Sequence, residues 1–591
     1  MQADRSIRPG FSRARRGLTR AALAVALPAL MLGACKQTKM SRGEVSASWS
    51  NKAITEVRGV PVFDVRRAIG QRLTEKRPAA LTEDTWGHVN RLYKQYGDGP
   101  LFLDKDGLNS DRVNGLLRAL VAADKDALRL DAYRLGDVAR AIDEVRKAEK
   151  PTAEQLAEAD VLLASAYAAL GEDLLIGQVN PRTVTDDWHI DAKDEKVDSA
   201  LARSLREETL EDAIRRMRPQ DEDYAALQKE LVRFREIAKK GGWKKVPAGE
   251  KLKPGDSAPA ARLAALRARL AAEGIEVPQA QAAAQPAGQP ANVAGAAREM
   301  YDAGLAGAVA RYQMLHGIPV DSILGEGTVA SMNISADYRL GQIAANLERF
   351  RWLPRALGER YVLVNVPAFR LQAFDGAEKS LEMKVIVGSE FEGRSTPVFA
   401  DSMTHVVFRP YWNITPEIQR KEIEPKIAQD PGYMARNDYE YWNDGGVRRI
   451  RQTPGPKNSL GLVKFMFPNS FNIYLHDTPE DALFEKDVRA FSHGCIRLEK
   501  PEEFARWVLG WDAGRVDDAM QRGKDNRTYN LDRKIPVYIV YFTAHIREGQ
   551  LAFGPDLYGR DEALVAKMTG ASGQTVQSIA AVNALSRLAG D

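Results

Sequence analysis

The sequence predicts an α+β protein with several domains, and three observations support this prediction. A chain of 591 residues is longer than one hydrophobic core can organise, so three or four domains are expected. Between about residues 57 and 243, apolar residues recur at the 3.6-residue period of helices. From Arg360 onward the period changes to two, which is the period of strands.

The charge balance argues against a nucleic-acid-binding protein. The formal net charge is +4, but residues 1–34 contain six arginines and a single acidic residue. The rest of the chain therefore holds 78 of the 84 basic and 79 of the 80 acidic side chains and is close to neutral. A basic surface that could hold a phosphate backbone is not predicted.

Residues 1–34 are predicted to be an export signal. Their arginines precede an apolar run, Ala21 to Leu32, that is too short to span a bilayer. The run ends in Leu32-Gly33-Ala34-Cys35, which resembles the lipobox of bacterial lipoproteins and implies cleavage before Cys35 and lipid attachment to it. An ordinary signal peptide with an incidental cysteine is the alternative. The pair Arg15-Arg16 leaves the general and the twin-arginine export routes both open.

A tether and a helical scaffold are expected next. Lipidation of Cys35 would place the chain on the periplasmic side of a bacterial membrane, and Lys36 favours the outer membrane. Residues 35–56 are polar, which suits a tether. Residues 57–245 are helical in pattern and include a predicted αα-hairpin, Leu201–Met217 and Tyr224–Ala238. We interpret them as a scaffold, in which the isolated His88 and His189 are structural.

Residues 255–335 are predicted to be a small helical module. A helix from Ala260 to Leu270 precedes the Ala/Gln/Pro-rich residues 277–295, whose composition cannot form a core and predicts a flexible insertion. The following sequence, with Tyr312-Gln313 ahead of His316-Gly317, resembles the three-helix peptidoglycan-binding module. The resemblance implies glycan or stem-peptide binding, and a purely structural packing role is the alternative.

The C-terminal half is predicted to be mostly β. Strands are expected at Tyr361–Val366, Leu381–Val387, 406–408, 471–475 and 537–542. Residues 415–445 are charged and largely helical in pattern, and we interpret them as an insertion that acts as a lid. Residues 560–591 become rich in Ala, Ser and Gly and predict a low-complexity tail.

The chemistry is expected at Ser492-His493-Gly494-Cys495. Cys495 is one of two cysteines, and if Cys35 is lipidated it is a free thiol outside the cytoplasm. A thiol with histidines in reach is the composition that nucleophilic catalysis requires. The helix predicted to begin at Pro501 places Cys495 on a loop between strand and helix, where backbone N–H groups can point at an oxyanion. A Cys35–Cys495 disulfide and a buried structural thiol are the alternatives.

The pattern of His476 followed by Ser492-His493-Gly494-Cys495-Ile496-Arg497 resembles the signature of the L,D-transpeptidases, the YkuD-type catalytic domain. Further similar strings are Arg394–Phe399, Pro410–Pro416 and Gln452–Gly461, and the resemblance covers residues 340–547. It implies a YkuD-type β-sandwich with short helices, joined here to the helical scaffold and the three-helix module. It also implies that Cys495 is the acylated nucleophile and that His476, 19 residues earlier, is its base.

The same resemblance implies supporting roles for neighbouring residues. Ser492, His493 and Gly494 are expected to support the loop and the oxyanion. Many members of the family have asparagine where this chain has Arg497, whose planar guanidinium suits a substrate carboxylate. A surface charge beside the helix is the alternative for Arg497. Contacts that shape the substrate groove are expected from Tyr411, Trp412 and Asn458.

The implied function is that of a peptidoglycan L,D-transpeptidase. Cys495 would take the acyl group of a tetrapeptide stem at its third residue, release D-Ala and pass the acyl group to a neighbouring stem as a 3→3 cross-link. Acylation by carbapenems is also implied. No metal or organic cofactor is expected, because the spacing of His and Cys offers no ligand set.

The expected partners are peptidoglycan stem peptides and, through Cys35, a membrane. The sequence predicts neither the acceptor of the acyl group nor the oligomeric state. Two other functions remain as alternatives. One is a thiol hydrolase, an L,D-carboxypeptidase or amidase, that acts on the same substrates. The other is a non-catalytic, lipid-anchored cell-wall tether.

Overall fold

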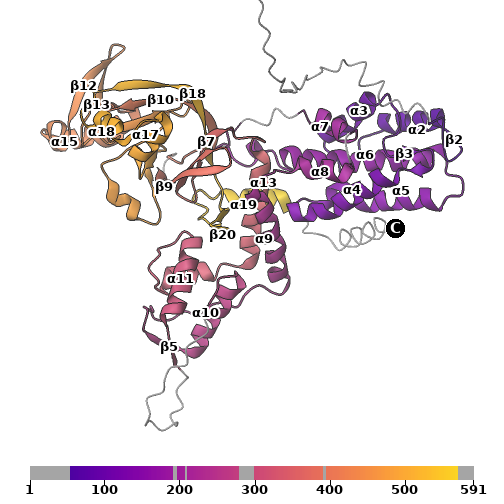
Figure 1. The fold of residues 1–591 in the computed structure, drawn as a ribbon, viewed down its shortest axis with the longest axis horizontal. Helices are drawn as coiled ribbons and strands as arrows, with labels where there is room; N and C mark the ends of the chain where they lie inside the picture. Colours follow the sequence, from indigo (N-terminus) through magenta and orange to yellow (C-terminus); the bar gives the residue numbers. More distant parts are fainter. Residues whose placement is uncertain (1–53, 191–195, 207–208, 278–297, 391–393, 570–591) are drawn as a thin grey trace, which may run out of the picture. The chain divides into compact units, whose positions relative to one another are not determined.

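The computed structural model describes residues 54–190, 196–206, 209–277, 298–390 and 394–569. The predicted export signal, Cys35, nearly all of the tether, the insertion from residue 278 and the end of the predicted tail lie outside the described residues. Figure 1 shows helices in the indigo to magenta half of the chain and most of the strands in the orange half. The α+β class predicted from the sequence is confirmed.

The N-terminal half is built around one long helix, α6 (Ala153–Ile176). It begins with a capping box in which Thr152 and Gln155 exchange hydrogen bonds. Apolar residues lie on all of its sides, so it is buried inside a core of helices. The other elements of this half are β1 (Glu56–Val57), β2 (Val60–Pro61), α2 (Val62–Thr74), α3 (Glu83–Gln95), β3 (Leu103–Asp104), β4 (Gly107–Leu108), α4 (Ser110–Ala122), α5 (Leu135–Lys147), α7 (Val197–Ser204) and α8 (Leu210–Met217).

The predicted αα-hairpin is only partly present. Its first helix is two short helices, α7 and α8, because Thr209 caps a new helix start by accepting a hydrogen bond from the backbone N–H of Asp212. Its second helix is α9 (Glu222–Lys239). The apolar face of α9 does not pack into the α6 core. It joins α13 (Ala336–Trp352) in the core of the C-terminal sheet.

The predicted helical module has its own small core. Its elements are β5 (Ser257–Pro259), α10 (Ala260–Ala272), β6 (Arg298–Met300), α11 (Ala303–Leu315) and α12 (Glu326–Met332). His316, from the motif that carried the resemblance, is buried and stacks on Tyr312 with ring centroids 3.8 Å apart. Its Nε2 lies 2.6 Å from Glu273, its Nδ1 lies 3.2 Å from Arg339, and the ring of Phe553 is 5.4 Å away. This histidine is therefore a packing residue, and the predicted glycan binding stays a prediction.

The strands of the C-terminal half form one nine-stranded sheet in the order β16-β9-β17-β15-β14-β10-β18-β7-β8. A further pairing of β8 with β9 closes eight of these strands into a ring. The long β9 makes the closure, because its first part pairs with β8 and its end pairs with β17 and β16. The strands are β7 (Arg360–Asn365), β8 (Arg370–Asp375), β9 (Glu378–Gly388), β10 (Phe399–Phe408), β14 (Val463–Met466), β15 (Leu475–His476), β16 (Ala490–Ser492), β17 (Ile496–Leu498) and β18 (Arg527–Val540).

Two helices cover part of this sheet. α17 (Pro501–Leu509) begins at proline and ends at Gly510, whose φ of +66° is a left-handed helix end, as the sequence predicts. α18 (Ala513–Gln521) follows it directly. The apolar residues of both helices, among them Phe504 and Val516, join the core of the sheet.

The predicted lid insertion is a compact element with its own core of Ile414, Ile423 and Ile450. It is helical at first, but the residues from Tyr439 onward form a hairpin, where a helical pattern was expected. The hairpin turns at Gly445-Gly446, both with positive φ. The elements are β11 (Trp412–Asn413), α14 (Pro416–Ile418), the π-helical turn η5 (Gln419–Ile423), α15 (Glu424–Gln429), α16 (Tyr433–Arg436), β12 (Tyr439–Asp444) and β13 (Val447–Gln452).

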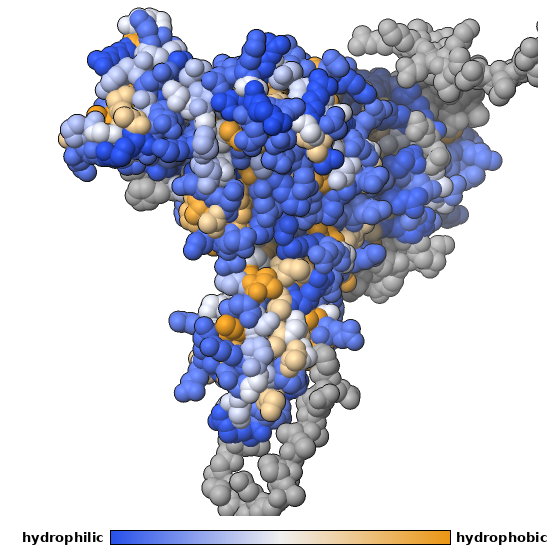
Figure 2. All heavy atoms as spheres, turned by 60° about the vertical axis from the view of Figure 1, so that its left-hand side comes forward, coloured by the Kyte–Doolittle hydropathy of each residue, from blue (hydrophilic) through white to orange (hydrophobic). Residues whose placement is uncertain are grey.

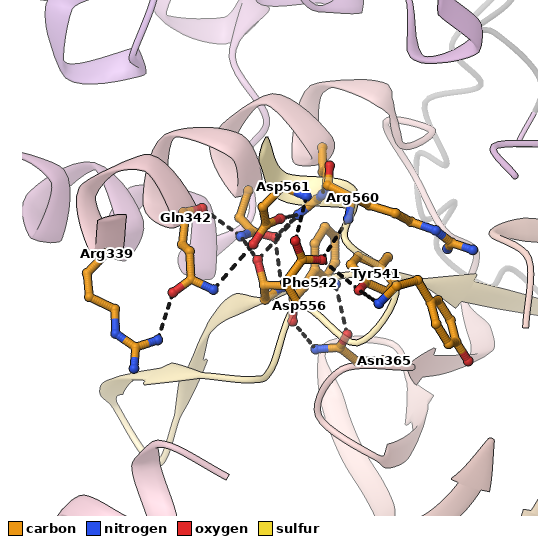
Figure 3. A network of polar contacts seen from close by, with 12 residues as sticks. Arg339, Gln342, Asn365, Tyr541, Phe542, Asp556, Arg560 and Asp561 are labelled. Carbon is orange, nitrogen blue, oxygen red and sulfur yellow. Dashed lines mark hydrogen bonds and ion pairs between the residues drawn. The ribbon is translucent and has the colours of Figure 1, made fainter. Parts of the chain in front are cut away.

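The first residues of the predicted C-terminal tail form a helix, and the rest of the tail lies outside the described residues. After the hairpin β19 (Ala544–Arg547) and β20 (Gln550–Phe553), the helix α19 (Arg560–Thr569) packs against α13. The carboxylate of Asp561 accepts from Arg349 of α13 at 2.6 Å and from Gln342 at 3.3 Å (Figure 3). These buried polar contacts give the segment a defined position.

The surface carries no large apolar area on the face drawn in Figure 2, where hydrophilic residues predominate and hydrophobic ones form small groups. The most exposed large hydrophobic residues, such as Phe63, Val320 and Val488, belong to different elements. Within the described ranges, no helix is both long enough and apolar enough to cross a membrane.

Candidate active site

Three neighbouring strands bring the charged side chains of the site together. β15 pairs with β14 on one side and with β17 on the other. In this register Lys464 lies opposite His476, and His476 lies opposite Arg497. Residues paired across neighbouring strands point to the same face of the sheet. His476 is therefore flanked by a cation on each side.

Cys495 lies in a tight turn between β16 and β17, next to Tyr474. The predicted loop from strand to helix is thus interrupted by β17, which at three residues is too short to give a period in the sequence. The half-buried thiol donates to the backbone carbonyl of Asn472, with an S···O distance of 3.7 Å. The hydroxyl and the backbone N–H of Tyr474 lie near the sulfur and lower the pKa of the thiol. The carbonyl of Asn472 therefore sets the direction of the thiol, and Tyr474 lies beside it.

The thiol is protonated in the resting site. Burial raises the pKa of Cys495 to about 11, against the hydrogen bonds of Tyr474 and the charges of Arg497 and Lys464, which lower it. At neutral pH the site accordingly holds a neutral thiol and not a preformed thiolate. Attack by the sulfur therefore requires a base that takes its proton.

His476 has the properties of that base. Burial, followed by the charges of Arg497 and Lys464, lowers the pKa of His476 to about 3, so the imidazole is neutral at physiological pH. Its Nδ1 lies 2.5 Å from the carbonyl oxygen of Asp477. Because a carbonyl oxygen only accepts, Nδ1 carries the ring proton and Nε2 keeps a free lone pair.

No hydrogen bond joins His476 to Cys495 within the described part of the chain. The ring of Tyr474 lies beside both, with its centroid 5.6 Å from that of His476. Contacts between a nucleophile and its base are often long in a free enzyme and shorten when substrate binds.

The turn that carries Cys495 is held by Ser492. The Ser492 hydroxyl donates to the carbonyl oxygen of Cys495 at 2.5 Å and accepts from the N–H of Gly494 at 3.1 Å. Gly494 has a φ of +110°, which a residue with a side chain rarely adopts. The N–H of Gly494 is thus occupied, so its predicted part in binding the oxyanion finds no support in this conformation.

Arg497 and His493 are each paired with a carboxylate. Arg497 forms an ion pair with Glu480. His493 Nε2 lies 2.6 Å from Glu422 of η5, and the same carboxylate oxygen accepts from Arg394 at 3.0 Å. Glu422 therefore connects the lid insertion directly to the cysteine turn, and π-helical turns such as η5 are frequent at functional sites.

The three predicted groove residues lie at the base of the insertion. The ring of Tyr411 is covered by the guanidinium of Arg451 at 3.9 Å, and Trp412 packs against the core of the insertion. Asn458 is 1% exposed, and its amide binds the backbone of its own loop and of Pro410. In this conformation Asn458 has no polar atom left for a substrate.

Sequence reasoning missed Tyr474, Lys464, Glu422 and Thr396. Tyr474 could have been found, because it lies two residues before His476 and a strand places such residues on the same face. Lys464 is placed by the pairing of β14 with β15, whereas Glu422 and Thr396 reach the cysteine turn from segments far apart in the sequence, so no local pattern marks these two. Within the described ranges, no group of three or more His, Cys, Asp or Glu side chains is arranged to hold a metal ion.

Comparison with known proteins matches both halves of the chain to domain families. Residues 359–539 match the L,D-transpeptidase catalytic domain (YkuD), and residues 87–231 match a scaffold domain. A Haemophilus influenzae protein named "Putative L,D-transpeptidase" is 32% identical over 243 residues. That match covers 38% of this chain and 48% of the relative, so the chain spans about half the length of the relative.

One solved structure is also similar. It is the crystal structure of the L,D-transpeptidase (residues 123–326) from Xylanimonas cellulosilytica DSM 15894, at 14% identity, with 50% of this chain and 99% of that chain covered. The TM-score is 0.18. The chain contains an L,D-transpeptidase catalytic domain of the YkuD family, together with a scaffold domain.

The reactivity of Cys495 is expected to rise with pH well beyond the range of an ordinary thiol. The thiolate is the reactive form, and the pKa of Cys495 lies at about 11. The rate of alkylation by iodoacetamide, followed by the mass of the Cys495 peptide, should therefore still increase between pH 9 and 10.5. Glutathione in the same solutions is the control. A rate for Cys495 that is already constant between pH 5 and 8 would show a preformed ion pair with His476 instead.

Proposed function

We propose that this protein is a peptidoglycan L,D-transpeptidase that forms 3→3 cross-links from tetrapeptide donor stems through a thioester on Cys495. The observation that carries the proposal is the position of Cys495 inside the matched catalytic domain, with Tyr474 beside both its sulfur and a neutral His476. This arrangement supplies a nucleophile and a base for acyl transfer at neutral pH.

The first half-reaction forms the thioester. Cys495 Sγ attacks the carbonyl carbon of the third residue of the donor stem while His476 Nε2 takes the thiol proton. The bond from that carbon to the nitrogen of the terminal D-Ala then breaks, and the proton passes from His476 to the leaving amine. The backbone N–H of Cys495 faces the oxyanion, since that of Gly494 is bound to Ser492.

The second half-reaction transfers the acyl group to an amine of a neighbouring stem. The amine must be neutral to attack the thioester, and His476 Nε2 accepts the proton that it loses. The C–S bond breaks and the sulfur takes this proton back, which restores the thiol. Because the pKa of His476 is low, the imidazole does not hold the proton between the two steps.

Lys464 is proposed to attract a carboxylate of the stem. Stem peptides carry free carboxylates, and the site presents two cations, Lys464 and Arg497. Arg497 is already paired with Glu480, whereas no carboxylate partner of Lys464 occurs among the described residues. Lys464 is therefore the cation that is free to bind, and Arg497 would bind only after release of Glu480.

The proposal includes attachment to a membrane on the periplasmic side, through lipid on Cys35. The support is the lipobox-like Leu32-Gly33-Ala34-Cys35 after an apolar run in the sequence. Globomycin should then cause an unprocessed precursor to accumulate. Unchanged processing in its presence would remove the anchor from the proposal and leave the enzyme.

Acylation of the cysteine is the direct test of the proposed function. Purified protein incubated with disaccharide-tetrapeptide should gain the mass of the donor minus D-Ala on the peptide that contains Cys495. Cys495→Ala should show no adduct. Release of D-Ala without any adduct on the wild-type peptide, at times shorter than one turnover, would argue against the thioester.

A further inference from the structure

The segment Arg394–Phe399 lies against the cysteine turn, yet the proposed mechanism gives it no part. Its Thr396 has an exposed fraction of 0%. The Thr396 hydroxyl accepts from the N–H of Gly388 at 2.9 Å and donates to the carbonyl oxygen of Gly494 at 2.9 Å. One side chain thus joins the end of β9 to the residue before the nucleophile.

The hydrogen bond from Thr396 to the Gly494 carbonyl also sets the direction of the Cys495 N–H. The carbonyl of Gly494 and the N–H of Cys495 belong to one planar peptide unit and point in opposite directions in the trans form. Because Thr396 holds the carbonyl on one side, the N–H is directed to the other side. This N–H has no hydrogen-bond partner among the described residues, whereas Ser492 binds both the Gly494 N–H and the Cys495 carbonyl.

We propose that Thr396 is a positioning residue, whose hydroxyl orients the Gly494–Cys495 peptide so that the Cys495 N–H is aimed at the oxyanion formed during acylation. The proposal rests on the proposed function. A backbone donor that is aligned before the reaction stabilises the developing charge without further reorganisation. Thr396 acts through the peptide and does not touch the substrate.

Segments outside the matched catalytic range 359–539 hold Thr396 in place. The hydroxyl of Tyr558 accepts from the Thr396 N–H at 3.2 Å and donates to the Gly388 carbonyl at 2.7 Å. Tyr558 is in turn held by Tyr541, whose hydroxyl accepts from the Tyr558 N–H at 2.7 Å and donates to Asp556 at 2.8 Å. Figure 3 shows Tyr541, Asp556 and Arg560 gathered at this point.

The segment after α6 also contacts the segment that contains Thr396. Val398 exchanges backbone hydrogen bonds with Asp187 and His189, at 2.9 and 2.7 Å. Arg560 of α19 pairs with Asp187 and also donates to the Thr396 carbonyl at 3.5 Å. The C-terminal segment and the segment around Asp187 therefore both contribute to the placement of Thr396.

The test compares two variants of Thr396 in two reactions of Cys495. Thr396→Val keeps the shape and removes the hydroxyl, whereas Thr396→Ser keeps the hydroxyl. Acylation by the tetrapeptide donor forms an oxyanion, but alkylation by iodoacetamide does not. Thr396→Val should lower the acylation rate by about 10²-fold, the size of effect known for loss of an oxyanion donor. Thr396→Ser should restore it to within a few-fold, and the alkylation rate should be nearly unchanged in both.

Two results would overturn the inference. Acylation of Thr396→Val at the wild-type rate would show that the hydroxyl does not orient the donor. A parallel loss of acylation and alkylation in Thr396→Val, with a lower melting temperature, would show a purely structural role. Tyr558→Phe is a second variant, which removes the hydroxyl that binds both the Thr396 N–H and the Gly388 carbonyl. It should lower acylation by about fivefold for each of these two neutral hydrogen bonds, again without an effect on alkylation. Wild-type protein that is never acylated would overturn the proposed function itself.

Discussion

His476→Ala should lower the rate of D-Ala release by about 10²–10⁴-fold, the range expected for loss of a general base. The resting thiol of Cys495 is protonated, since its pKa lies at about 11, and it cannot attack without transfer of the proton. His476 is neutral at physiological pH, because its pKa lies near 3, and its Nε2 has a free lone pair. The rate of D-Ala release under substrate saturation measures the effect.

Two other histidine variants serve as controls for the loss of rate in His476→Ala. His88→Ala removes a hydrogen-bonded histidine of the N-terminal helical region, where it pairs with Asp198, and should leave the rate unchanged. His493→Ala breaks the contact with Glu422 of the lid insertion and should change the rate less than His476→Ala does. A larger loss in His493→Ala than in His476→Ala would move the role of base to His493.

Gly388→Ala should both destabilise the protein and impair acylation. A Cβ at this position would overlap the carbonyl oxygen of Arg394, and it would lie 2.9 Å from the nitrogen of Thr396 and 3.0 Å from the Cα of Gly494. These are backbone atoms, which cannot rotate away as the end of a side chain can. We expect a loss of about 1–3 kcal/mol in the free energy of unfolding, the usual cost of overpacking. A shift of the cysteine turn by about 1 Å should lower acylation by about 10²-fold.

Urea unfolding and the acylation rate measure the two effects separately. Gly307→Ala is the matched control, because Gly307 lies in α11 with nothing within 4 Å of an added Cβ. Alanine there should keep or slightly raise stability, since it is a better helix former than glycine. Wild-type stability and acylation in Gly388→Ala would show that the segment and the turn can move apart, and the close packing of this region would then be irrelevant to the site.

Much of the fold could be predicted because long elements carry their period in the sequence. The strands near residues 361–366 and 381–387, the buried α6 and the helix from Pro501 to Gly510 are all present. The three-residue strands β16 and β17 could not be predicted, because so few residues give no period. The closure of the sheet through β8 and β9 also has no local signature, since it depends on how β9 bends between two partners.

The candidate site, like the fold, could be predicted from the sequence only in part. The resemblance marked Cys495 and His476, and the structure supplies the reason for their protonation states. For Cys495 that reason is burial, and for His476 it is burial together with the charges of Lys464 and Arg497 on either side of the imidazole. The contact between Glu422 and His493 joins residues 71 positions apart, and the bond from Thr396 to Gly494 joins residues 98 apart. Such contacts are set by the packing of whole segments, so a pattern of neighbouring residues cannot reveal them.

The central claim, acyl transfer by Cys495 between peptidoglycan stems, is tested most directly by the masses of the products. Disaccharide-tetrapeptide is incubated with the wild-type protein and with Cys495→Ala. The account predicts a dimer whose mass equals two donors minus one D-Ala, formed only by the wild-type protein. Stem shortening without a dimer would contradict transfer and indicate a hydrolase, and unchanged substrate with both proteins would contradict catalysis altogether.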